Sequence, residues 1–135
     1  MKHHQIIIPR RLWQSMREQV SREAPLESCG LVAGRKGLAE KIYPVKNMLA
    51  SPARFRMEPH EQLRAFEAIE DSGLDLLAIY HSHPTGPATP SETDIQESQY
   101  EVISLIWSPR NSEWSLRAFW LEKTGAAEIF VEIQE

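Results

Sequence analysis

The spacing of hydrophobic residues divides the chain into helical and extended segments. Residues 10–23 and 59–71 carry apolar side chains three or four positions apart and are predicted to be helices. A shorter helix is predicted over 91–98. Apolar or alternating runs predict strands over 6–8, 29–34, 40–45, 74–80, 101–107, 114–122 and 126–133. Helices and strands alternate at first and a run of strands follows, which predicts an α/β fold with a mixed sheet and helices packed against it.

Turn-forming residues separate these segments. Residues 47–54 contain asparagine, serine and proline and are predicted to be a loop, with a brief strand at Phe55 and Met57. The sequence Ser-Pro-Arg-Asn over 108–111 is predicted to be a turn that separates the strand 101–107 from the strand 114–122. The run 29–34 is apolar throughout, a pattern typical of a central strand that is buried on both faces.

The length and composition exclude several classes of protein. A chain of 135 residues fits one domain, spanning 1–135, and can bury a core without disulfides. A net charge of −4 offers no basic face, so no nucleic-acid partner is expected. Cys29 is the one cysteine, which suits a reducing compartment, and the three isoleucines before Pro9 are too few for a membrane span or a signal-peptide core. A cytoplasmic protein without membrane contact is expected.

Two histidines stand at the end of the apolar strand 74–80. His81 and His83 are separated by one residue, and side chains two positions apart in a strand point the same way, so both imidazoles can reach one ion. Ser82 then points away and is expected to have a packing role. A His-x-His pair alone is weak evidence for a metal, because such pairs occur by chance on surfaces.

The segment after the pair supplies a carboxylate. Ser91 follows His83 after seven residues, and Asp94 follows Ser91 after two more, so that both would lie on one face of the short helix. Two histidines and one aspartate leave a fourth tetrahedral position for water, the arrangement of a catalytic zinc. The sequence therefore predicts a site of His81, His83 and Asp94 that binds one Zn²⁺ with a bound water or hydroxide.

Helix capping explains the same serine and aspartate without a metal. Ser91 to Asp94 fits a capping box, and Thr89 to Glu92 fits another with proline at the first helical position. The Thr89 version would leave Ser91 and Asp94 free for other contacts. Neither version explains the two histidines, and capping and catalysis can coexist.

These residues carry a resemblance to a known family. His81-Ser-His83-Pro, seven residues, Ser91, two residues and Asp94, preceded by Glu27-Ser-Cys-Gly-Leu-Val-Ala-Gly34, resemble the JAMM motif of the MPN+ (Mov34/MPN/PAD-1) metallopeptidases in a compact prokaryotic form. The likeness extends over about residues 5–133. It implies a partly curled, mixed sheet flanked by helices, a layered architecture similar to that of the cytidine deaminases.

The resemblance also implies roles for individual residues. His81, His83 and Asp94 would be the zinc ligands, Glu27 would be the catalytic base that shuttles protons, and Ser91 would help to hold the oxyanion of the tetrahedral intermediate. Without the motif, Glu27 would be read as a solvated loop carboxylate after Pro25.

The substrate that this resemblance implies is a ubiquitin-like protein. The chain has no room for a large insertion near Asp94. This favours hydrolysis of a bond after the C-terminal Gly-Gly tail of a β-grasp sulfur carrier protein, including release of cysteine from a carrier adduct. The alternatives are a broader isopeptidase on ubiquitin-like conjugates and, from another class, a non-catalytic MPN scaffold, against which the intact Glu27, His81, His83, Ser91 and Asp94 argue. The sequence leaves homo-oligomerisation open.

Overall fold

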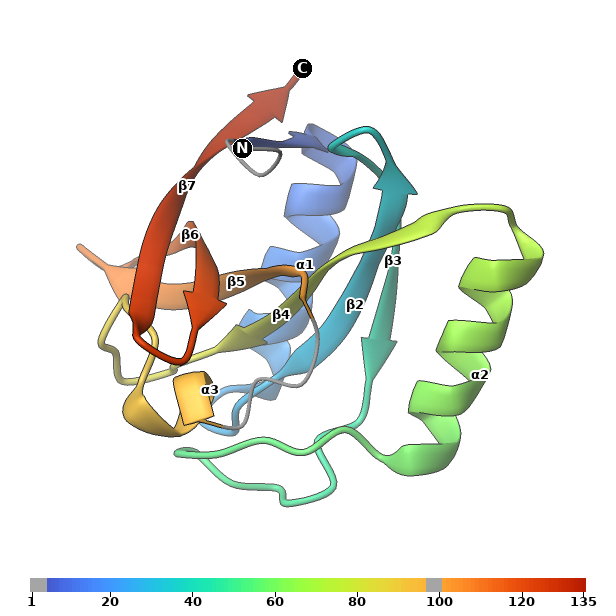
Figure 1. Ribbon diagram of the computed structural model, residues 1–135. Coiled ribbons are helices and arrows are strands. Elements are labelled where there is room, and N and C mark those ends of the chain that lie inside the picture. Colours follow the sequence, from blue (N-terminus) through green and yellow to red (C-terminus); the bar gives the residue numbers. More distant parts are fainter. Residues whose placement is uncertain (1–4, 97–100) are drawn as a thin grey trace.

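A computed structural model describes residues 5–96 and 101–135. The elements are β1 (Gln5–Pro9), α1 (Arg10–Glu23), β2 (Cys29–Arg35), β3 (Leu38–Val45), α2 (Pro59–Asp71), β4 (Asp75–Ser82), α3 (Glu92–Gln96), β5 (Ile103–Arg110), β6 (Glu113–Glu122) and β7 (Gly125–Gln134). Figure 1 shows the curled sheet with α1 on one side of β2 and β3 and α2 on the other.

The strands form one mixed sheet in the order β1-β3-β2-β4-β5-β6-β7. β1 pairs in parallel with β3 and with β7, so the sheet curls round until its ends meet. β4 and β5 are also parallel, and the other neighbouring pairs are antiparallel. The predicted mixed, partly curled α/β architecture is confirmed.

β2 is buried on both of its faces because a helix covers each side of the sheet at this point. Val32 belongs to the apolar cluster that contains Met16 and Val20 of α1. Its neighbours Leu31 and Ala33 point the other way, into the cluster that contains Ile69 of α2. This alternation is that of an ordinary strand, and burying both faces requires the continuous apolar run seen in the sequence.

The two long helices begin and end where their sequences predict. α2 starts with Pro59 at its first turn, and the Glu58 side chain caps it by accepting a hydrogen bond from the Glu61 N–H at 2.9 Å. α1 ends before Pro25, which cannot continue a helix. The first and last residues of both helices are set by neighbouring residues in the chain, which is why the sequence alone predicts them.

Three local predictions were wrong or incomplete. The turn predicted over 108–111 is shorter and lies later, because β5 runs to Arg110 and a two-residue turn at Asn111 and Ser112, both with positive φ, connects it to β6. In place of a brief strand at Phe55 and Met57, only Met57 forms a bridge, with Asn47. The short helix starts at Glu92, and its predicted continuation past residue 96 lies outside the described residues.

In the described ranges, 5–96 and 101–135, none of the helices has the length and apolarity needed to cross a bilayer.

Candidate metal centre

β4 brings the two histidines to one side of the sheet. His81 lies in the strand and His83 directly follows it, with the His83 N–H continuing the ladder by donating to the Trp107 carbonyl at 2.8 Å. Ser82 faces the other way, where its Oγ accepts a hydrogen bond from the Ser28 N–H at 2.8 Å. The side-chain alternation predicted from the sequence therefore holds, and Ser82 has the expected packing role.

The first turn of α3 places a carboxylate against this pair. The Ser91 N–H donates to Asp94 Oδ2 at 2.8 Å, and the Asp94 N–H donates to Ser91 Oγ at 2.9 Å. This reciprocal pair is the capping box that starts at Ser91, not the alternative that starts at Thr89. The cap orients the Asp94 carboxylate toward His83, so capping is compatible with a contact to the histidines.

Three side-chain atoms converge at this point. His81 Nε2 and His83 Nε2 lie 3.1 Å apart, and Asp94 Oδ2 lies 3.3 Å and 3.2 Å from them. Zinc bonds nitrogen and oxygen at about 2.0–2.2 Å, and ligands at that radius in a tetrahedron lie about 3.3–3.6 Å apart. The donor set and its spacing fit a zinc ion with three protein ligands.

The ring orientation of His83 supports the same conclusion. Its Nδ1 donates a hydrogen bond to the Pro87 carbonyl at 2.8 Å, so in the neutral ring Nε2, which faces Asp94 and His81, is the nitrogen that can bind a metal. Histidine ligands of metals commonly have such a carbonyl partner for the other ring nitrogen. The Phe55 ring stacks on His81 at a centroid distance of 4.6 Å and an interplanar angle of 23°.

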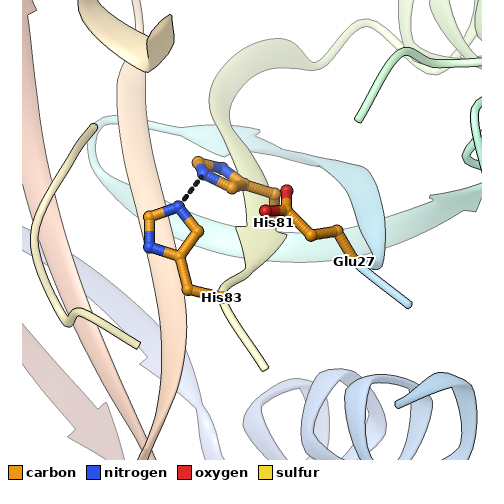
Figure 2. A group of neighbouring side chains, drawn as sticks. All are labelled: Glu27, His81 and His83. Atoms are coloured by element: carbon orange, nitrogen blue, oxygen red, sulfur yellow. Dashed lines mark hydrogen bonds between the residues drawn. The ribbon is translucent and has the colours of Figure 1, made fainter. Parts of the chain in front are cut away.

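Glu27 lies beside this centre, in the loop before β2. One of its carboxylate oxygens lies within 4.8 Å of a ring nitrogen of His81 and of His83, and Figure 2 shows it directed toward His81. Only 5% of the Glu27 residue is exposed. Burial raises the pKa of Glu27 to about 7, while His83 works to lower it and Asp94 to raise it. A carboxyl with this pKa can both take and return a proton near neutral pH.

Burial and the shared carboxylate also set the protonation of the other groups. Burial lowers the pKa of His81 below the ordinary histidine value. Burial acts in the same direction on His83, but hydrogen bonds to Asp94 and to the Pro87 carbonyl raise its pKa overall. Burial opposes ionisation of Asp94, and the hydrogen bonds from both histidines outweigh it, so the pKa of Asp94 falls well below its usual range. Asp94 is therefore ionised, the state in which a carboxylate can bind a metal.

All five residues singled out in the sequence meet at one end of the molecule. Figure 1 shows the start of β2, the end of β4 and α3 close together there. A groove of about 620 Å³ opens beside His81, Ser91 and Asp94, and its walls include the segment 53–57.

Sequence reasoning missed Phe55 and Pro87 as neighbours of the histidines. No local signal marks either contact, because each depends on how a loop folds back.

Known proteins resemble this chain over most of its length. A probable TtuB-protein conjugate cleaving protease of Thermus thermophilus is 44% identical over 76% of this chain and 69% of its own. A desampylase of Pyrococcus furiosus is 30% identical over 96% and 91%. A CysO-cysteine peptidase of Mycobacterium tuberculosis is 36% identical over 73% of each chain.

Solved structures share the fold. The solution structure of a protein from Desulfitobacterium hafniense has a TM-score of 0.87 at 30% identity, covering 96% of this chain and 93% of that one. A JAB1/MPN domain protein from Archaeoglobus fulgidus has a TM-score of 0.62 at 19% identity, covering 96% and 97%.

Two of these relatives are named as a protease and a peptidase, and the Glu27, His81 and His83 side chains form a buried group that could hold a metal, so the chain is a metallopeptidase of the JAMM type. The family described as prokaryotic homologs of the JAB domain matches residues 9–122, and the chain belongs to that family.

Proposed function

We propose that residues 1–135 act as one catalytic domain, a zinc-dependent peptidase that cleaves the bond after the C-terminal Gly-Gly tail of a ubiquitin-like sulfur carrier protein. The observation that carries the peptidase part is the convergence of His81 Nε2, His83 Nε2 and Asp94 Oδ2 within 3.1–3.3 Å of one another, beside the buried Glu27. A non-catalytic scaffold would need none of these groups.

His81, His83 and Asp94 would hold the ion, with Ser91 fixing the carboxylate from the helix cap. Zinc bound there would polarise a carbonyl and lower the pKa of water to about 7. Glu27, whose buried carboxylate lies beside the histidines, would accept a proton from the attacking water and deliver it to the leaving amine.

Ser91 would stabilise the developing oxyanion. Its Oγ accepts a hydrogen bond from the Asp94 N–H, and that contact occupies an acceptor position only. The hydroxyl proton is still available for donation. Helix capping by Ser91 is thus compatible with a role in the reaction.

The names of two relatives support a carrier adduct as the substrate. The CysO-cysteine peptidase and the TtuB-protein conjugate cleaving protease are both named for separating a protein from a group attached to it. A groove of about 620 Å³ is large enough for an extended peptide tail. We infer that this groove receives the tail of the carrier.

Cleavage of isopeptide-linked conjugates is the second candidate. The conjugate cleaving protease is the relative with 44% identity, and its name refers to protein conjugates. The two functions differ in the leaving group, which is a single amino acid in one case and a lysine side chain of a protein in the other.

Mass spectrometry separates these functions. The zinc-loaded protein would be incubated with a β-grasp carrier that ends in Gly-Gly, supplied once as a cysteine adduct and once as an isopeptide conjugate, with Glu27→Gln as the control. Loss of the added mass from the cysteine adduct alone supports the first function, and loss from the conjugate alone supports the second. Intact substrates after incubation with the zinc-loaded wild type would rule out both.

A further inference from the structure

Asn47 lies just after β3 and uses its whole side chain to hold backbone groups of two loops. Its Nδ2 donates to the carbonyls of Glu27 at 3.1 Å and Arg54 at 3.0 Å. Its Oδ1 accepts from the N–H groups of Leu49 at 3.1 Å and Arg56 at 3.0 Å. A side-chain amide has two donor hydrogens and two acceptor lone pairs, so all four positions are occupied.

These four bonds link the two sides of the metal centre. One bond reaches the backbone of Glu27, the residue whose carboxylate lies by the histidines. Two others hold the residues on either side of Phe55, whose ring stacks on His81 at 4.6 Å. The Asn47 amide therefore connects the position of the carboxylate to the position of the aromatic wall of the groove.

The backbone of Glu27 has no strand of its own to fix it, because β2 begins only at Cys29. Its carbonyl is held by Asn47, and its N–H donates to the Ser51 carbonyl at 2.8 Å. Both contacts come from the loop that starts at Asn47. The loop thus holds both peptide groups of Glu27, while the next residue, Ser28, is held by Ser82 of β4.

We infer that Asn47 is a positioning residue for the reaction, because it holds Glu27 and the segment around Phe55 in a fixed position relative to the histidines. This role rests on the proposed function of Glu27. Displacing a reacting group by about 1 Å can cost about 100-fold in rate, so a residue that only touches backbone can control turnover.

Asn47→Asp is the test variant because it keeps the shape of the side chain. One carboxylate oxygen still accepts from Leu49 and Arg56, while the other replaces the donor and repels the carbonyls of Glu27 and Arg54. Ser51→Ala is the matched control in the same loop. The Ser51 Oγ accepts from the N–H groups of Ala53 and Arg54, whereas the contact with Glu27 uses the Ser51 backbone carbonyl, which the substitution keeps.

Two measurements decide the question. Hydrogen exchange on the metal-free protein is expected to show at least a tenfold faster exchange of the Glu27 amide in Asn47→Asp and an unchanged rate in Ser51→Ala. In the zinc-loaded protein, kcat is expected to fall at least tenfold in Asn47→Asp, with KM and bound zinc nearly unchanged, and to stay within about twofold of wild type in Ser51→Ala. Asn47→Ser replaces Asn47→Asp if the latter does not fold.

Wild-type exchange at Glu27, or a wild-type kcat in Asn47→Asp, would overturn the positioning role. An equal loss of kcat in Ser51→Ala would also overturn it, because general loosening of the loop would then be enough. The exchange experiment does not need activity. An inactive wild type would therefore count against the proposed function, while the link from Asn47 to Glu27 would still be decided.

Discussion

Ser91 and Asp94 each donate a backbone N–H to the side chain of the other, at 2.8 Å and 2.9 Å. The Oδ2 atom that accepts from Ser91 is the same atom that lies 3.2–3.3 Å from the two histidines. A common helix cap therefore orients the carboxylate that we propose as a metal ligand.

Ser91→Ala is expected to slow peptide cleavage by about 10²–10³ while zinc stays bound, because it removes a hydroxyl donor but keeps the backbone N–H that orients Asp94. Ser91→Thr keeps the hydroxyl and is the matched control. Steady-state kinetics with metal analysis on the same samples checks this. Unchanged turnover in the alanine variant would remove Ser91 from the reaction.

Asp94→Asn is expected to lose zinc during dialysis against a weak chelator, because a neutral amide oxygen is a poorer ligand and the two histidines alone do not form the site. Glu27→Gln should keep about one zinc per chain and lose activity. Binding to the folded state also raises the melting temperature, so added zinc should stabilise Glu27→Gln and have little effect on Asp94→Asn. A zinc content equal to wild type in Asp94→Asn would exclude Asp94 as a ligand.

The pKa of Glu27 predicts a pH-dependent stability of the metal-free protein. Its pKa is raised from 4.5 to about 7 by burial. Below pH 4.5 both the folded and the unfolded chain hold the proton. As the pH rises toward 7 the unfolded chain ionises first, so the stability that Glu27 contributes is lost across this window and is gone above it.

Glu27→Gln has no such loss, since an amide does not titrate in this range. In thermal denaturation with a chelator present, the variant should melt above the wild type at pH 8.5 and close to it at pH 4.5. A melting difference that is the same at both pH values would contradict the raised pKa.

Gly30→Ala is expected to destabilise the fold by about 1–3 kcal/mol through overpacking. A Cβ atom at Gly30 would lie 2.3 Å from the Cζ of Tyr80, a buried ring whose hydroxyl donates to Gln19 at 2.5 Å and therefore cannot easily move. Urea denaturation measures the loss. In a Tyr80→Leu background the same substitution should cost clearly less, and an equal cost in both backgrounds would refute the clash.

The sequence alone predicts those features of the structure that depend on neighbouring residues in the chain. The limits of α1 and α2 follow from Pro25, Pro59 and the spacing of apolar side chains, and the common direction of His81 and His83 follows from strand alternation. The limits predicted for the turn at Ser-Pro-Arg-Asn were wrong, since only Asn111 of these four residues lies outside the strands. Turn-forming residues mark a change of direction, but how many of them remain in the strands depends on pairing with the partner strand.

The choice between the two capping boxes was also beyond the sequence. Both Thr89 and Ser91 suit an N-cap position, and the Ser91 version is the one formed, with Asp94 in contact with the histidines. A contact of this kind involves residues more than ten positions away in the chain, so propensities at the helix start could not decide it.

By itself the sequence determined the set of chemical groups, the strand and helix that carry them, and the family to which the chain belongs. Only the tertiary structure decided that Glu27 reaches the histidines, because the antiparallel pairing of β2 with β4 sets Cys29 opposite His81 across more than fifty residues. The same is true of Asn47. Its four hydrogen bonds go to backbone carbonyl and N–H groups, which every residue type except proline has, so no pattern of side chains predicts them.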